Sequence, residues 1–242
     1  MRIRNVICLL FFSFLGQLNI VCGQATTVIF DPTKSAAAEK VAPQLEQLIR
    51  REALPKVKKL ISTETCDESF NIIGAANGAF TRAKAAQTAI VYEYCQNGNG
   101  FAEDGIVIVE NQKLTAHYLY NGGWNLSVKS LPDINQNGLD ELLVEASGGM
   151  HQGFYGSGID ILEFSSDDVS SIGGVVTNTN ECEENERGEE CPHAFAISVR
   201  PGVDPIFFKQ RFDEQGENKW KKSGIMSKFS LNKSDTKYDS VK

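Results

Sequence analysis

A nine-residue segment, Asp133–Glu141, constrains this chain more than any other feature of its sequence. Side chains that carry oxygen atoms stand at its first, third, fifth and ninth positions, and Gly138 stands at the sixth. A hard cation such as calcium takes six to eight oxygen ligands, and a tight loop can supply them from alternating positions. Glycine permits the sharp turn that such a loop requires. The segment therefore predicts a calcium-binding loop.

The candidate metal ligands are the side-chain oxygens of Asp133, Asn135, Asn137 and Glu141 and the backbone carbonyl of Leu139. Only two of these ligands are charged, and affinity follows the charge of the ligand set, so we expect a weak site with a Kd on the order of 10⁻⁴–10⁻³ M. An EF-hand is excluded because its loop needs a glutamate at the twelfth position, where this chain has Val144. A metal-free turn of Asn and Gly residues is the alternative interpretation.

The segment Asp133–Val144 resembles the calcium loop and following strand of an FG-GAP (VCBS-type) repeat, the blade unit of integrin-alpha-type β-propellers. It matches that family's pattern D-x-[DN]-x-[DN]-G-x-[DN]-[DE]-L-x-[VL], and Gly158–Phe164 extends the resemblance as the partner strand. The resemblance implies calcium-ligand roles for the same five residues. Because the motif occurs once, we expect one blade-like unit in a β-sheet domain and not a closed propeller.

Short runs rich in Val, Ile, Tyr and Trp begin at Thr88 and are separated by Gly, Asn and Asp. Many short strands at close spacing are typical of antiparallel sheets. The expected fold is therefore α+β and mainly antiparallel β. The predicted strands are Thr88–Cys95, Gly105–Glu110, Leu114–Tyr120, Trp124–Lys129, Glu141–Ala146, Gly158–Phe164, Ala194–Val199, Pro205–Phe212 and Lys219–Lys222.

An N-terminal helix is expected in front of these strands. Asp31-Pro32 is a plausible helix start, and an apolar stripe runs from Val41 to Ile61. Pro43 and Pro55 interrupt the stripe, so we expect a break or kink.

The N-terminus has the pattern of a secretory signal. Arg2 and Arg4 precede the apolar run Val6–Leu15, and small residues stand before Gln24. The run is too short for a stable membrane span, so we expect a secreted or periplasmic protein. The predicted organisation is a signal peptide at 1–23, a helical segment at 24–63, a β-rich domain at 64–231 with its loop at 133–141, and a disordered tail at 232–242.

Charge and cysteine content limit the partners and the compartment. Removing Arg2 and Arg4 leaves 22 of the 24 basic residues against 31 acidic ones, a formal charge of −9, which disfavours nucleic acid. Four cysteines remain, and an even number in an exported chain predicts two disulfides. We favour Cys66–Cys95 and Cys182–Cys191 because each pair is closest in sequence. A zinc site at Cys191 and His193 is a weaker alternative because no C-x-x-C pair exists.

These features favour an exported, non-enzymatic β-rich module with a structural calcium loop, serving as a binding or envelope-associated protein with a protein or glycan ligand. The alternative is a secreted hydrolase with a site near the Gly148–Gly158 segment, where His151 is the candidate residue. The simpler interpretation of that segment is a flexible loop between strands. We interpret four further acidic residues as solvated charges: Asp160, Glu163, Asp167 and Asp168.

Overall fold

The computed structural model describes residues 25–34, 41–61, 70–96, 102–122, 124–151, 154–165, 168–179, 192–216, 219–234 and 236–241. The predicted signal segment and three of the four remaining cysteines, Cys66, Cys182 and Cys191, lie outside these residues. Cys95 is buried and disulfide-bonded, while both proposed pairings stay predictions. In the described ranges, no helix combines the length and the apolar character needed to span a bilayer.

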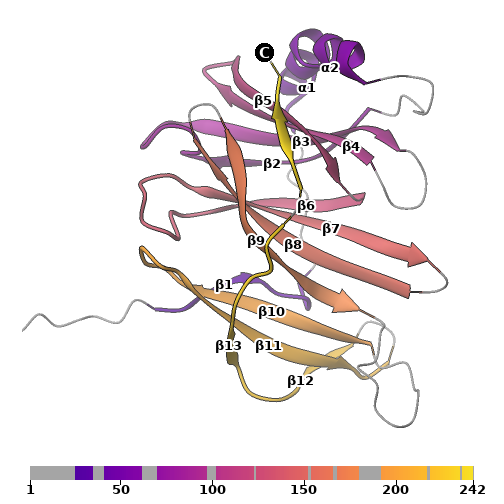
Figure 1. The fold of residues 1–242 in the computed structure, drawn as a ribbon, viewed down its shortest axis with the longest axis vertical. Helices are drawn as coiled ribbons and strands as arrows, with labels where there is room; N and C mark the ends of the chain where they lie inside the picture. Colours follow the sequence, from indigo (N-terminus) through magenta and orange to yellow (C-terminus); the bar gives the residue numbers. More distant parts are fainter. Residues whose placement is uncertain are drawn as a thin grey trace, which may run out of the picture.

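Two antiparallel sheets make up most of the molecule, as predicted (Figure 1). The smaller sheet has the order β14-β5-β4-β3-β2, and the larger has the order β12-β11-β10-β9-β8-β7-β6, with β1 beside β10 and β13 beside β11. Among the described residues no barrel closes, although one sheet curls into a half-barrel. The strands are β1 (Thr27–Phe30), β2 (Asn71–Gly78), β3 (Gln87–Gln96), β4 (Ala102–Glu110), β5 (Lys113–Gly122), β6 (Trp124–Leu131), β7 (Glu141–His151), β8 (Phe154–Phe164), β9 (Val169–Thr179), β10 (His193–Arg200), β11 (Ile206–Glu214), β12 (Trp220–Lys222), β13 (Ser227–Phe229) and β14 (Tyr238–Ser240).

The N-terminal region differs from the prediction of a helix alone. Strand β1 precedes the helices and pairs with β10, far along the chain. The helical stripe forms two short helices, α1 (Pro43–Glu52) and α2 (Leu54–Leu60). Pro43 and Pro55 lie in the first turns of these helices, where a missing N–H costs no helical hydrogen bond. Asp31 accepts a hydrogen bond from Thr33 N in a turn (3.0 Å) and does not cap a described helix.

The predicted disordered tail is also wrong for the residues that the structure describes. Asn232 forms an antiparallel bridge with Gly174 of the larger sheet. Strand β14 then pairs with β5 of the smaller sheet, with Tyr238 opposite Tyr120. The tail is polar enough to suggest fraying, but its partners lie 58 and 118 positions earlier in the chain and leave no local signal. The C-terminal segment therefore links the two sheets.

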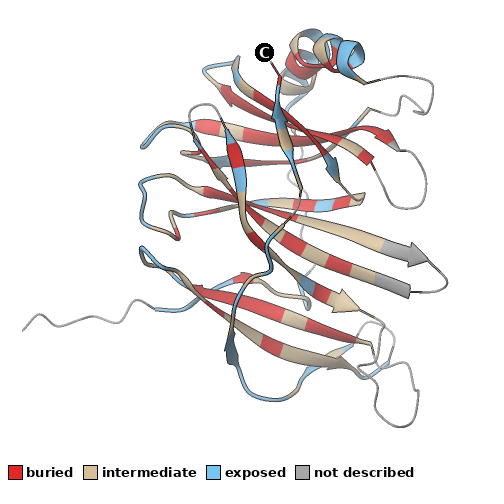
Figure 2. Cartoon of the chain, viewed as in Figure 1, coloured by how far each residue is buried: buried red, intermediate tan, exposed pale blue. Residues whose placement is uncertain are grey.

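Alternating apolar residues form three packed layers. On β4, Ile106 and Ile108 pack in the layer between the two sheets, whereas Val107 and Val109 pack in the layer that includes the helices. On β7, Leu142 belongs to the layer between the sheets and Leu143 to the third layer, on the opposite face of the larger sheet. Figure 2 shows the buried residues along β3 and β4. Strands buried on both faces have continuous apolar runs, which explains why these strands were predictable.

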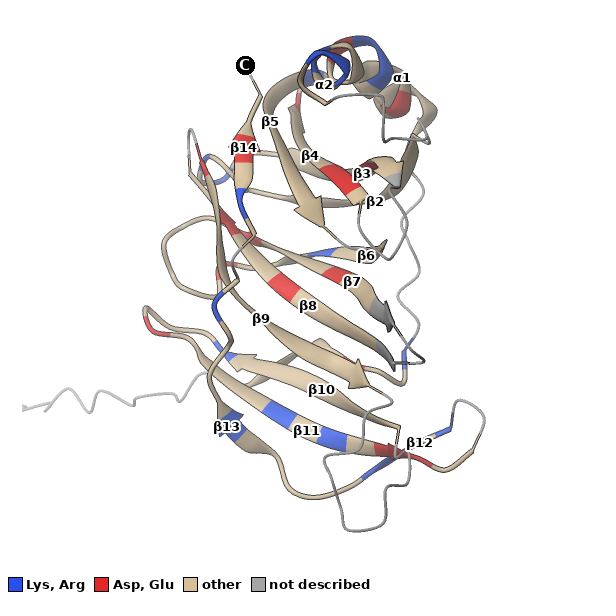
Figure 3. Cartoon of the chain, turned by 45° about the vertical axis from the view of Figure 1, so that its right-hand side comes forward, with Lys and Arg blue, Asp and Glu red and all other residues tan. Residues whose placement is uncertain are grey.

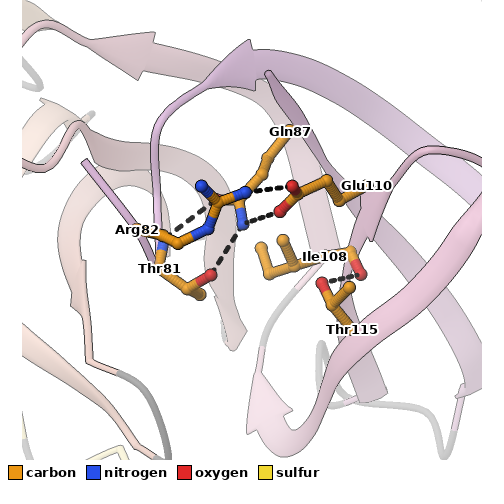
Figure 4. Close-up of polar contacts among 6 residues, drawn as sticks. All are labelled: Thr81, Arg82, Gln87, Ile108, Glu110 and Thr115. Atoms are coloured by element: carbon orange, nitrogen blue, oxygen red, sulfur yellow. Dashed lines mark hydrogen bonds and ion pairs between the residues drawn. The ribbon is translucent and has the colours of Figure 1, made fainter. Parts of the chain in front are cut away.

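A polar cluster centred on the buried Gln87 braces the β2–β3 connection (Figure 4). Gln87, which is 3% exposed, accepts a hydrogen bond from Thr81 N (2.9 Å) and donates to Thr81 Oγ1 (2.7 Å) and Glu110 Oε2 (2.9 Å). Arg82 forms an ion pair with the same carboxylate of Glu110. These contacts hold the β2–β3 connection in one conformation beside Ala79, and Ala79 N donates a hydrogen bond to Asp140 of the predicted calcium segment.

A second buried pair lies in the layer beneath the helices. The ring of Tyr92 lies over Gly105, where any Cβ would collide with it. Its hydroxyl is 2.6 Å from His117 Nε2, and His117 is 2% exposed. Burial, together with the charge of Lys56, lowers the pKa of His117 to about 4. His117 therefore stays neutral in the folded protein at pH values where the unfolded chain protonates it.

This pair predicts a loss of stability in mild acid. The contribution of His117 to the free energy of unfolding should be fully present above pH 6.5, the ordinary pKa of histidine. It should be lost as the pH drops toward 4, because in this range only the unfolded state takes up the proton. The full loss is on the order of 3 kcal/mol. Urea denaturation across this range measures it, and His117→Gln should flatten the slope. Parallel curves for the two proteins would contradict the assignment.

Candidate metal site

The predicted calcium segment forms the connection between β6 and β7. The two strands are antiparallel neighbours, with Leu131 opposite Glu141, so the loop returns the chain onto the adjacent strand. Asp133, Gln136 and Gly138 have positive φ angles of 26°, 61° and 90°. Such left-handed backbone winds a segment tightly, and glycine adopts it at the lowest cost. The motif therefore folds as a compact turn between paired strands.

Three side chains of this loop accept hydrogen bonds from its own backbone. Asp133 Oδ2 accepts from Gly138 N at 3.1 Å. Asn135 Oδ1 accepts from Asn137 N at 3.1 Å, and Asn137 Oδ1 accepts from Leu139 N at 2.8 Å. Each oxygen keeps a second lone pair, so these contacts orient the side chains and leave them able to bind a cation.

Glu141 is the most buried member of the predicted ligand set, with no exposed surface. Its Oε2 accepts a hydrogen bond from Ile134 N (2.9 Å), whereas its Oε1 has no hydrogen-bond partner among the described residues. Burial raises the pKa of Glu141 to about 7, the Ile134 N–H opposes the rise, and the carboxylates of Asp133 and Glu163 add to it. The site is therefore short of positive charge.

Asp133 also has an oxygen without a partner: its Oδ1 is buried and makes no hydrogen bond within the described part of the chain. Leaving a buried acceptor without a partner costs on the order of 1–3 kcal/mol, and more if it is charged. Two such oxygens in one loop, beside amide oxygens held by the backbone, fit a cation that prefers oxygen ligands. The described residues contain no cluster of three or more His, Cys, Asp or Glu side chains placed for a metal, so amide and carbonyl oxygens would have to complete the shell.

Sequence reasoning missed one residue at this site. Glu163, interpreted from sequence as a solvated charge, accepts a hydrogen bond from Asn137 Nδ2 (2.6 Å). It comes from β8, which the structure places beside β7, and its charge acts on Glu141. Asp160 is a second correction, since it accepts hydrogen bonds from the Ser171 hydroxyl and from Tyr238 OH. Neither contact has a local sequence signal, because each joins residues of different strands.

Asp140 has a separate role in the same loop. Its Oδ2 accepts a hydrogen bond from Ala79 N (2.7 Å), and its Oδ1 accepts from Asp133 N (3.3 Å). Its own N–H donates to Ala79 O (3.0 Å). Since Ala79 belongs to the β2–β3 connection of the smaller sheet, Asp140 joins the candidate metal loop to the second sheet.

The Gly148–Gly158 segment is mostly strand and not the flexible loop expected from its glycines. Strand β7 continues to His151 and β8 begins at Phe154, with Gly148 opposite Gly156. The side chain of His151 lies outside the described residues, so its proposed role in a hydrolase stays a prediction.

Replacing Asp140 tests the link between the loop and the smaller sheet. Asp140→Ala removes the acceptor of two backbone N–H groups, and we expect it to lower the free energy of unfolding by about 1–3 kcal/mol. Chemical denaturation in EDTA excludes any contribution from metal. The exposed Asp204→Ala is the matched control and should change stability by less than about 0.5 kcal/mol. Equal stability of the two variants would contradict the proposed role of Asp140.

Comparison of this chain with protein-family models, curated proteins and solved structures finds no match. The likeness of residues 133–144 to an FG-GAP repeat therefore remains a resemblance carried by the motif. The chemistry open to the site follows from its own residues: its carboxylate, amide and carbonyl oxygens are the ligand types that calcium takes.

Proposed function

We propose that this chain is an exported, non-enzymatic β-rich module that binds a structural calcium ion in its β6–β7 loop. Its biological role would be that of a binding or envelope-associated protein with a protein or glycan ligand. The signal-like N-terminus and the acidic composition support export and disfavour nucleic acid. The mass of the exported protein tests this part: the chain should begin at Gln24, and a product retaining Arg2 and Arg4 would contradict it.

The observation that carries the calcium proposal is the pair of buried, unpartnered oxygens, Asp133 Oδ1 and Glu141 Oε1, in one loop. A bound calcium ion would supply the positive charge that both lack. Asn135 and Asn137 would contribute their amide oxygens, which backbone N–H groups already orient. Leu139 would contribute its carbonyl, since its own N–H is fixed on Asn137. These residues account for the whole predicted ligand set.

The proposed ion would stabilise the protein only modestly. With two charged ligands, we expect a Kd on the order of 10⁻⁴–10⁻³ M, which suits the millimolar calcium found outside cells. At calcium about ten-fold above Kd, the added free energy of unfolding is RT ln(1 + [L]/Kd), or about 1.4 kcal/mol. For a chain of this size that amounts to a rise of a few degrees in Tm.

Thermal melting with calcium and with EDTA tests this proposal. Calcium should raise Tm of the wild-type protein by a few degrees and give a binding heat in calorimetry. Glu141→Gln keeps the size of the side chain and removes its charge, so the variant should fold in EDTA but lose the calcium response. Asp204→Asn, which removes an exposed carboxylate outside the loop, should keep it. An unchanged wild-type Tm together with no calcium heat would reject the metal site.

A further inference from the structure

A cavity of about 350 Å³ lies between the two sheets, away from the metal loop. Its walls come from β5, β6, β7, β8 and β9 and from the C-terminal segment around Asn232 and Tyr238. Figure 1 shows this segment running from the larger sheet to the smaller one. The volume is within the range of small-molecule sites. Apolar side chains such as Val144 and Leu162 cover one wall, and the rings of Tyr120 and Tyr238, with centroids 5.1 Å apart, cover another. The cavity can therefore enclose an apolar or aromatic group.

Buried polar groups border this cavity. Asn125 lines it and is 9% exposed, and its Oδ1 accepts a hydrogen bond from Tyr120 OH (3.3 Å). Asp104 on β4 has no exposed surface, and the Asn125 amide interacts with its carboxylate. This carboxylate occupies the space where Gly122, a lining residue, would carry a Cβ. Polar groups therefore stand beside the apolar walls of the cavity.

The charges around the cavity are mostly negative. Asp160 on β8 lines it, and Asp104 lies behind Gly122, with Glu93 of β3 directly across the ladder from Asp104. Burial raises the pKa of Asp104 to about 8, the Asn125 amide opposes the rise, and the carboxylates of Glu93 and Glu103 add to it. Asp104 is therefore mostly protonated at neutral pH, so the carboxylate available to a ligand is that of Asp160, which lines the cavity. The one basic side chain among the lining residues, Lys233, is exposed. Figure 3 shows acidic residues along β7 and β8, whereas the basic residues of β11 lie toward the end of the molecule opposite the helices.

We propose that this cavity binds a small organic cation, an amine or guanidinium on an apolar or aromatic body, with Asp160 as its counter-charge. Each carboxylate oxygen of Asp160 accepts one hydrogen bond, from Ser171 or from Tyr238, and keeps a lone pair for a charged donor, and charge-assisted bonds are the stronger kind. The faces of Tyr120 and Tyr238 attract positive charge as well. A carboxylate ligand would be repelled, and a neutral ligand would leave the charge of Asp160 uncompensated. This site shares no ligand residue with the calcium loop and does not depend on it.

Calorimetric titration with three compounds that share one ring tests the proposal: tyramine as the cation, para-ethylphenol as the neutral form and para-hydroxyphenylacetate as the anion. Agmatine serves as the guanidinium probe. We expect saturable binding of tyramine or agmatine and at least about ten-fold weaker binding of the neutral and anionic compounds. Equal binding of tyramine and para-ethylphenol, or no binding of either cation at millimolar concentration, would overturn the proposal.

Variants assign the binding to this cavity. Asp160→Asn should weaken cation binding at least about ten-fold. Asp239→Asn is the matched control, because Asp239 adjoins Tyr238 on β14 but is exposed and does not line the cavity, and it should bind as wild type. Val176→Trp should block binding without unfolding the protein, since Val176 lines the cavity yet is 54% exposed.

Two outcomes of the variant series would contradict the inference. Wild-type affinity in Asp160→Asn would show that charge does not select the ligand. Competition between tyramine and calcium at Asp160 would assign the cavity to metal instead. Glu141→Gln should keep tyramine binding, so failure of the calcium site and failure of this site are separate results.

Discussion

The apolar layer packed between the two sheets holds them together, and the carboxylate of Asp140 adds a polar link beside it. This carboxylate accepts hydrogen bonds from Ala79 of the smaller sheet's first connection and from Asp133 of the β6–β7 loop. The β2–β3 connection is itself held by Gln87 and its partners. The loop, the connection and both sheets thus form one hydrogen-bonded unit. A metal bound in this loop would stabilise contacts of both sheets and not the turn alone.

The two candidate sites share one physical origin. Each places a carboxylate, Glu141 or Asp160, on a strand of the larger sheet beside buried apolar side chains. Burying such a group costs free energy unless a cation or a donor compensates it. The sites differ in what surrounds the carboxylate. Around Glu141 the neighbours are amide and carbonyl oxygens, which suit calcium, whereas around Asp160 they include tyrosine rings and apolar side chains, which suit an organic cation.

Much of the fold could be read from local pattern. Nine predicted strands correspond to β3–β8 and β10–β12, because runs such as those of β3 and β4 are apolar on both faces. Strands β2 and β9 were missed, since Asn71–Gly78 and Val169–Thr179 are rich in small and polar residues and pack through their neighbours. The break or kink expected from the prolines is present, because the helical stripe ends at Glu52 and starts again at Leu54, with Pro55 in the first turn of α2. The β-propensity of a segment reflects its own residues, whereas strand formation also depends on the distant strand with which it pairs.

The sequence by itself determined the mainly antiparallel β architecture and a tight, oxygen-rich turn at Asp133–Glu141, because strand alternation and turn chemistry act between residues close in the chain. Only the tertiary structure decided that β14 closes the smaller sheet and that Asp140 contacts Ala79. It also brought Asp160 to Tyr238, 78 positions apart in sequence. Such contacts arise when sheets pack, and packing depends on the summed burial of many residues and not on any local motif.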